Sequence, residues 1–266
     1  MPLTLTALSG IPFIRRDDNL ADIVVNTLQE NNIKLEDNDI LVFAQKIVSK
    51  AEGRTVNLAT ITPSQRAIEL AKQTEKDSRV VELILQESNE VLRTRVGALI
   101  VEHKLGFVCA NAGIDHSNVG SSNDFSRSKP AAEDTAIGEY VLLLPENPDR
   151  SAKNIRRQIE EKTGKRVGIL IIDSHGRAWR NGTVGVAIGI AGIPGLEDLR
   201  GRPDLFGYKL QVTQVGVADE LAAAASLMMG QAAEGTPVVH VRGFPYPVRE
   251  SSLKELIRPK DQDLFR

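Results

Sequence analysis

Short runs of consecutive apolar residues recur along the chain, each bounded by polar or turn-forming residues. Such runs are typical of strands, because a surface helix of the same length would carry polar positions between the apolar ones. The pattern predicts strands at 40–44, 98–102, 107–111, 140–144, 167–172, 210–215 and 238–241. A further strand is expected at 183–191, where Gly185 and Gly189 indicate bulges or close backbone approach.

Other segments carry apolar residues at helical spacing. Asp17 and Asp18 are expected to cap the first helix, on which Leu20, Val24 and Leu28 share a face. The residues at 62–65, Thr-Pro-Ser-Gln, resemble a capping box with proline at the first helical position, and they predict a helix to about residue 73. Further helices are expected at 77–88, 151–163, 218–229 and 252–257.

The mixture of strands and helices predicts an α+β fold with a mixed sheet. No linker divides the chain, so any second domain would be inserted rather than appended. We expect one unit of two interleaved subdomains, 1–97 with 200–266 and 98–199. The stretch 120–138 is rich in Ser, Asn, Asp and Lys, and we expect an insertion loop there that could close over a site.

Composition and charge narrow the class of protein. The 266 residues include 33 Lys and Arg against 35 Asp and Glu, a formal net charge of −2, which argues against a nucleic-acid-binding protein. No apolar run is long enough to span a membrane, and no secretion signal is visible. The single cysteine, Cys109, excludes an intrachain disulfide and is expected in the core. We therefore expect a cytoplasmic protein without membrane contact.

Two aspartates follow predicted strands. Asp115 comes soon after the strand at 107–111, and Asp173 directly follows the one at 167–172. If the strands are neighbours, the two carboxylates converge and need a cation, and oxygen ligands of this kind suit Mg²⁺ or Mn²⁺. The alternative is that each aspartate caps a turn or a helix. The spacing leaves both interpretations open.

Phosphate-binding signatures of the common nucleotide folds are absent. The sequence has no G-x-x-x-x-G-K-[ST] segment and no G-x-G-x-x-G between a strand and a helix, and it has no G-x-S-x-G nucleophile elbow. Lys46, Ser49, Lys50 and Arg54 form a basic segment that could hold phosphate, although a solvated turn has the same pattern. Gly230 is a natural helix stop, and Gln231 beside it could coordinate a ligand or simply end the helix.

Several short motifs together resemble one family, coenzyme F420-0:L-glutamate ligase (F420 gamma-glutamyl ligase). In order from about residue 8 to residue 243, they are IVSKAEGR at 47–54, NAGID at 111–115 with Ser117 and Asn118, Leu144-Pro145, Pro148-Asp149, Ser151-Ala152, Asp173-Ser174 with Gly176-Arg177, ADELAA at 218–223, Met229-Gly230 and Arg242-Gly243. Each motif alone is weak, but the set is specific.

The resemblance implies a GTP-dependent ligase with an unusual α+β fold that lacks a phosphate-loop or Rossmann unit. The implied reaction joins L-glutamate to the lactyl carboxylate of coenzyme F420-0, a phospholactyl deazaflavin, and then adds further glutamate through γ-linkages. The implied cofactors are Mg²⁺ or Mn²⁺, assisted by K⁺, and the implied assembly is an intertwined homodimer. No flavin reductase domain is expected after the family core.

Site residues are carried over from the family motifs. The resemblance implies metal ligation by Asp115, Asp173, Ser174 and Gln231, and catalytic roles for Lys50, Asp115 and Asp173. It implies nucleotide contacts from Ser9, Gly10, Ile11, Pro12, Gln45, Lys46, Lys50, Asn118, Met229, Gly230, Gln231, Ala232, Ala233, Glu234, Gly235 and Thr236. Two alternatives use the same cleft: a metal-dependent nucleotide phosphohydrolase, and a deazaflavin-binding protein without catalysis.

Overall fold

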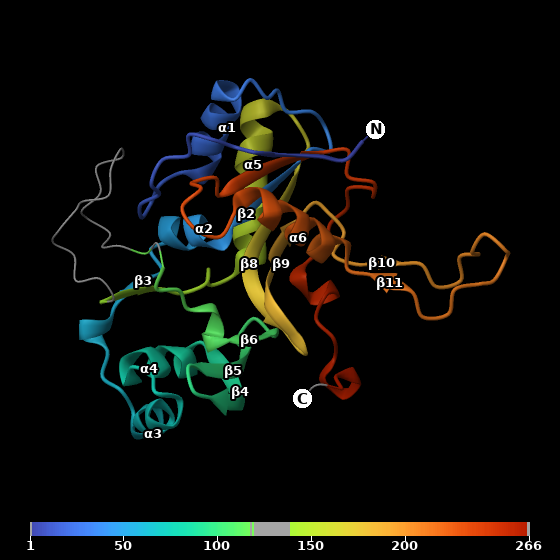
Figure 1. The fold of residues 1–266 in the computed structure, drawn as a ribbon. Helices are drawn as coiled ribbons and strands as arrows, with labels where there is room; N and C mark the ends of the chain where they lie inside the picture. Colours follow the sequence, from blue (N-terminus) through green and yellow to red (C-terminus); the bar gives the residue numbers. More distant parts are fainter. Residues whose placement is uncertain (1, 118, 120–138, 265–266) are drawn as a thin grey trace.

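A five-stranded mixed sheet lies at the centre of the larger part of the chain (Figure 1). The computed structural model describes residues 2–117, 119 and 139–264. The strand order is β1-β12-β2-β8-β9; β2 and β8 run parallel, and the other neighbours are antiparallel. The strands are β1 (Thr4–Ala7), β2 (Ile40–Ala44), β8 (Gly168–Arg177), β9 (Arg180–Ala191) and β12 (Val238–Arg242).

Helices cover both faces of this sheet. On one face lie α1 (Leu20–Glu30), α2 (Gln45–Ala51) and α5 (Pro148–Thr163), and on the other lies α6 (Val217–Met229). The strand β2 is apolar throughout because both of its faces are covered. Leu41 and Phe43 pack towards α1 and α5, while Ile40 and Val42 pack towards α6. A strand between two helical layers has no solvent-facing side, so strict alternation with polar residues is lost.

A smaller group of elements has its own hydrophobic core. It contains α3 (Gln65–Thr74), α4 (Ser78–Gln86) and the antiparallel sheet β4-β5-β6. The strands are β4 (Ser88–Arg95), β5 (Ala98–His103) and β6 (Val108–Ala110). The paired strands β3 (Thr55–Asn57) and β7 (Tyr140–Leu142) connect it to the larger part. Short 3₁₀ helices lie at Leu58–Thr60, Asn111–Gly113, Leu253–Glu255 and Lys260–Gln262.

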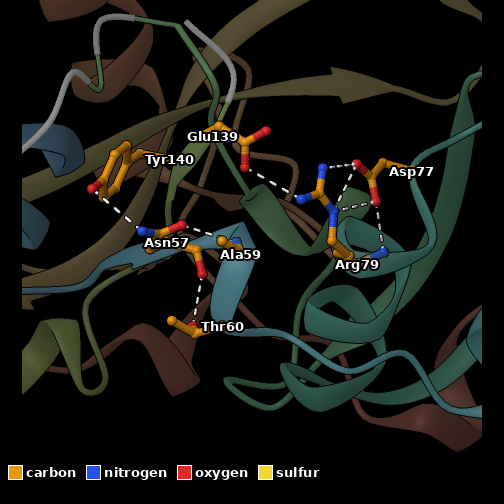
Figure 2. Close-up of polar contacts among 7 residues, drawn as sticks. All are labelled: Asn57, Ala59, Thr60, Asp77, Arg79, Glu139 and Tyr140. Carbon is orange, nitrogen blue, oxygen red and sulfur yellow. Dashed lines mark hydrogen bonds and ion pairs between the residues drawn. The ribbon is translucent and has the colours of Figure 1, made fainter. Parts of the chain in front are cut away.

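Polar contacts hold the start of β7 against this smaller group (Figure 2). Asn57 Nδ2 donates to the Tyr140 hydroxyl at 3.3 Å. Beside it, the Arg79 guanidinium on α4 lies 3.3 Å from the Glu139 carboxylate and also binds Asp77, the residue that caps α4. These contacts set where the chain enters β7. The predicted insertion loop at 120–138 lies outside the described residues.

An arm projects from the body between β9 and α6 (Figure 1). Its base is the antiparallel pair β10 (Glu197–Asp198) and β11 (Gln214–Val215). The tip exposes large apolar side chains: Leu205 is 98% exposed and Phe206 is 95% exposed. The strand predicted at 210–215 is wrong over most of its length, because only its last two residues pair with β10.

The expected α+β fold and mixed sheet are confirmed, with several changes at element ends. Asn19, not Asp17 or Asp18, caps α1 through bonds to two backbone amides. Ser64 caps α3, so Pro63 precedes the cap instead of starting the helix. Proline does occupy the first position of α5, which begins at Pro148, three residues earlier than predicted. The subdomain boundaries proposed from the sequence stay a prediction.

Several elements were missed, among them α2, β1, β3, β4 and β10, and one strand is longer than its apolar run. The helix α2 follows β2 without a loop. A solvated turn had been one interpretation of the basic segment from Lys46 to Arg54. The strands β1 and β4 carry too many polar and exposed residues to be recognised. The strand β8 continues for five residues beyond Ile172, because pairing with β9 satisfies its backbone where its side chains are polar. Among the described residues, no helix is long and apolar enough to cross a membrane.

Close packing between β9 and α6 depends on glycine at position 185. A Cβ atom there would lie 2.6 Å from Ser226 Cβ and would also collide with the Ala222 carbonyl oxygen. We expect Gly185→Ala to lower the free energy of unfolding by about 1–3 kcal/mol, because α6 must shift to accept the methyl group. Gly176→Ala is the matched control, since a Cβ at that position of the same hairpin meets nothing within 4 Å. Equal melting temperatures for the two variants would contradict the packing argument.

Candidate functional site

A cleft of about 1000 Å³ collects most of the residues singled out from the sequence. Its walls come from α2, the 3₁₀ turn after β6, the middle of β8 and the segment that follows α6. Of the predicted site residues it is lined by Gln45, Lys46, Lys50, Asp115, Asp173, Ser174 and all of 229–236. The neighbouring residues Phe13 to Arg16 line it, whereas Ser9, Gly10, Ile11 and Pro12 are not among the lining residues. Asn118 lies outside the described residues.

Asp115 is held in the cleft wall by its backbone. Its amide donates to the Leu142 carbonyl at 3.0 Å, and its carbonyl accepts from the Leu142 amide at 2.9 Å. The carboxylate has two neighbours on α2: Gln45 Nε2 donates to Oδ2 at 2.7 Å, and Lys46 Nζ lies 3.5 Å from Oδ1. Asp115 therefore links β7 to α2.

The electrostatics of Asp115 indicate a site that needs positive charge. Burial raises the pKa of Asp115 to about 6, and the nearby Asp173 carboxylate adds to that rise, while Lys46 opposes it. A bound cation would favour the ionised form of Asp115, which burial and the neighbouring carboxylate disfavour. Asp115 and Asp173 line the same cleft, although the strands that precede or contain them belong to different sheets.

Asp173 and Ser174 lie inside β8 and not after its end, as the apolar run had suggested. Both residues line the cleft, but their side chains have different hydrogen-bond partners. Asp173 Oδ2 lies 3.1 Å from His175 Nε2, on the next residue of the same face. Ser174 Oγ donates to Gln231 Oε1 at 2.9 Å, across to the segment after α6.

The segment after α6 borders the cleft on the Ser174 side. Gly230 ends the helix with φ of +72°, a backbone conformation that favours glycine, and thus confirms the helix stop predicted there. The Gln231 amide is held at both ends, since Nε2 donates to Ser226 Oγ at 2.8 Å. Ser226 was missed from the sequence because it stands among the alanines of a helix.

Two lysines one helical turn apart supply positive charge to the cleft. Lys46 Nζ donates to Ser117 Oγ at 2.9 Å as well as facing Asp115. Burial and the charge of Lys46 lower the pKa of Lys50. A pair of cationic groups beside two carboxylates is typical of sites for phosphorylated ligands that arrive with a metal ion. Recognising α2 as a helix would have placed both lysines on one face.

The side chains that could bind a metal suit a Mg²⁺ or Mn²⁺ ion that keeps water or substrate ligands. In the described part of the chain they do not form a site in which protein side chains supply all the ligands. Among the described residues, no three His, Cys, Asp or Glu side chains gather to hold a metal. Asp115, Asp173 and Ser174 supply two carboxylates and a hydroxyl beside an open cleft. Mg²⁺ is commonly bound by one or two carboxylates, with water and substrate phosphates completing its shell.

The cleft and fold therefore define a class of protein with a mixed α+β scaffold and a charged site between two groups of elements. The family model for F420-0:Gamma-glutamyl ligase matches residues 10–243. The chain is 49% identical over 232 residues to the Coenzyme F420:L-glutamate ligase of Methanococcus maripaludis strain C6, covering 87% of this chain and 86% of that protein. It is 43% identical over 268 residues to the protein of that name from Methanothermobacter thermautotrophicus, covering 100% of both.

A third relative with the same name, from Methanocaldococcus jannaschii, is 47% identical over 232 residues, which cover 87% of this chain and 86% of the relative. The chain belongs to the F420-0:gamma-glutamyl ligase family. The resemblance found from the short motifs is thereby confirmed.

Proposed function

We propose that the protein joins L-glutamate to the terminal carboxylate of coenzyme F420-0 at the expense of GTP, and then adds further glutamate through γ-linkages. The observation that carries this proposal is the meeting of Asp115, Asp173 and two lysines in one cleft of a chain that belongs to this family. The relatives are named for glutamate ligation to coenzyme F420. GTP use is the finer part, and it follows from the family resemblance.

The first step activates a poor acyl donor. A carboxylate oxygen of F420-0 attacks the γ-phosphorus of GTP, the bond to the β-phosphate oxygen breaks, and GDP leaves with the bond's electron pair. The product is an acyl phosphate. Negative charge gathers on the phosphate oxygens during this transfer, and Lys46 and Lys50 border the cleft where it would develop.

In the second step, the amine of glutamate attacks the acyl carbon, inorganic phosphate leaves and the nitrogen loses a proton. No covalent intermediate with the protein is needed, so the side chains act by positioning and electrostatics. Asp115, Asp173 and Ser174 would hold a divalent cation, which supplies charge stabilisation to the phosphate oxygens when it is bound. The further role of K⁺ stays a prediction from the resemblance.

The proposed reaction is tested with purified protein, F420-0, glutamate and Mg²⁺, followed by mass spectrometry. We expect mass increases of one or more glutamyl units with GTP, and rates with ATP lower by at least about 10-fold, since guanine-specific hydrogen bonds are typically worth more than about 1.4 kcal/mol in discrimination. Equal rates with both nucleotides would contradict GTP dependence. Phosphate release without a glutamylated product would support the phosphohydrolase alternative.

We also propose a homodimer in which the arm between β9 and α6 packs on a second copy. The arm tip exposes Leu205, Phe206 and Tyr208, and α6 exposes Leu227 and Met228. Apolar patches that stand clear of the body are typical of surfaces that become buried in an assembly. The family resemblance adds to this argument, because it implies an intertwined homodimer.

Phe206→Asp is expected to convert the dimer into a monomer, because it places a charge in the proposed apolar contact. The measurement is sedimentation velocity at micromolar concentration. Gln211→Asp, a change of similar charge on the same exposed arm, is the control and should leave the assembly intact. A monomeric wild type, or a Phe206→Asp variant that still sediments as a dimer, would overturn the proposal.

A further inference from the structure

Gln45 and Ser49 form a buried pair of polar residues beneath Asp115. Gln45 is the first residue of α2 and is 2% exposed, and Ser49 is fully buried one turn later. Ser49 Oγ donates to Gln45 Oε1 at 2.9 Å. Gln45 Nε2 in turn donates to Asp115 Oδ2 at 2.7 Å. The three side chains thus form a continuous hydrogen-bond network, here called the relay, from Ser49 in the buried part of α2 to Asp115 in the cleft.

The relay determines how the Gln45 amide is oriented. The Ser49 hydroxyl donates to Oε1, so the oxygen faces the serine and the NH₂ group faces the carboxylate. A buried glutamine is costly unless its polar atoms are hydrogen-bonded, and here both ends of the amide have partners within the chain. This arrangement differs from the nucleotide contact that the family resemblance implies for Gln45.

The two carboxylate oxygens of Asp115 therefore have different neighbours. Oδ2 is held by Gln45, whereas Oδ1 lies 3.5 Å from Lys46 Nζ. We propose that Gln45, oriented by Ser49, is a positioning residue that holds Asp115 with Oδ1 available to a divalent cation. The inference rests on the proposed function for the metal, but it concerns how this chain prepares the ligand.

The physical reason is the cost of ordering a ligand. A carboxylate that rotates freely loses rotamer freedom when it binds a cation, and a partner that has already fixed it removes that cost. Hydrogen-bond partners behind metal ligands typically change affinity or activity by about 10- to 100-fold when they are removed. Ser49 acts only through Gln45, so its own removal should matter less.

The test measures Mn²⁺ binding directly, without nucleotide or turnover. The electron paramagnetic resonance signal of free Mn²⁺ is followed during titration of the wild type, Gln45→Met, Ser49→Ala and the double variant. Methionine matches the length of glutamine but lacks its hydrogen bonds. We expect the Kd for Mn²⁺ to rise by about 10-fold or more in Gln45→Met and by about 3-fold in Ser49→Ala. The double variant should bind no more weakly than Gln45→Met alone, because the serine acts through the glutamine.

Val48→Ala is the control for destabilisation of the same helix. Val48 is 1% exposed and does not line the cleft, so its truncation should lower the melting temperature without changing the Kd for Mn²⁺. An unchanged Kd in Gln45→Met, additive effects in the double variant, or no saturable Mn²⁺ binding by the wild type would each overturn the inference. A wild type that binds Mn²⁺ but forms no glutamylated product would instead overturn the proposed function alone.

Discussion

Asp115→Asn is expected to lower the rate of glutamate ligation by at least about 100-fold, because a neutral amide oxygen is a much weaker ligand for Mg²⁺ or Mn²⁺ than a carboxylate. Asparagine keeps the shape of aspartate and can still accept the hydrogen bond from Gln45. The measurement is the ligation rate as a function of Mn²⁺ concentration for both proteins.

The same variant should fold as well as the wild type. The pKa of Asp115 is raised to about 6, above its ordinary value of 3.8, so the charged form is disfavoured in the folded state. At neutral pH a neutral asparagine removes that cost, and the melting temperature of the metal-free protein should stay equal or rise. A large fall in melting temperature would indicate a structural role instead.

Ser174→Ala provides the contrast within the same site. Its hydroxyl donates to Gln231, and a water molecule can replace one neutral ligand of a hydrated cation. We expect a loss of activity smaller than that of Asp115→Asn. If Ser174→Ala were the more damaging change, the ranking of the two ligands would be wrong.

Asp39→Ala is expected to have the largest effect on stability, lowering the free energy of unfolding by about 3–5 kcal/mol. Asp39 is 2% exposed before β2 and accepts from two residues of β12: His240 Nε2 at 2.8 Å, and Arg242 Nε and Nη2 at 2.9 and 2.7 Å. Its removal leaves a histidine and an arginine without their shared carboxylate. The measurement is denaturant unfolding at pH 7.

Asp22→Ala is the matched control, since its ion pair with Lys162 is half exposed and should contribute less than about 1 kcal/mol. The pH dependence supplies a second test. Hydrogen bonds from Arg242 and His240 hold the pKa of Asp39 below its ordinary value of 3.8 against the opposing effect of burial. A depressed pKa contributes stability above pH 3.8 that is lost as the pH falls through the folded-state pKa. The stability difference between wild type and Asp39→Asn should therefore narrow as the pH falls below 3.8.

Glycine positions were more informative about packing than the polar residues were about the site. Gly185 and Gly189 predicted close backbone approach, and both positions lie against neighbouring helices. Both predictions rest on the size of a side chain, which does not depend on a partner distant in sequence.

Local rules failed where a tertiary contact replaced them. The apolar run at 167–172 suggested a strand that stops before Asp173, but pairing with β9 extends β8 to Arg177 and places Asp173 and Ser174 inside the strand. The helix α2 was missed because it begins directly after a strand, and its first residue, Gln45, is polar yet buried. Its partners, Asp115 and Ser49, explain that burial, and one of them lies 70 residues away in the sequence.

The sequence by itself determined the family, the mixed α+β composition, the apolar strands at the centre of the sheet and several of the charged and polar residues that line the cleft. These properties follow from side-chain size, apolar periodicity and ordered motifs, all of which are local. Only the tertiary structure decided that Asp115 and Asp173 share a cleft, that Gln45 supports Asp115 from below, and that Ser174 meets Gln231. Those contacts join residues 57 to 70 positions apart, and their geometry depends on how the sheet and helices pack.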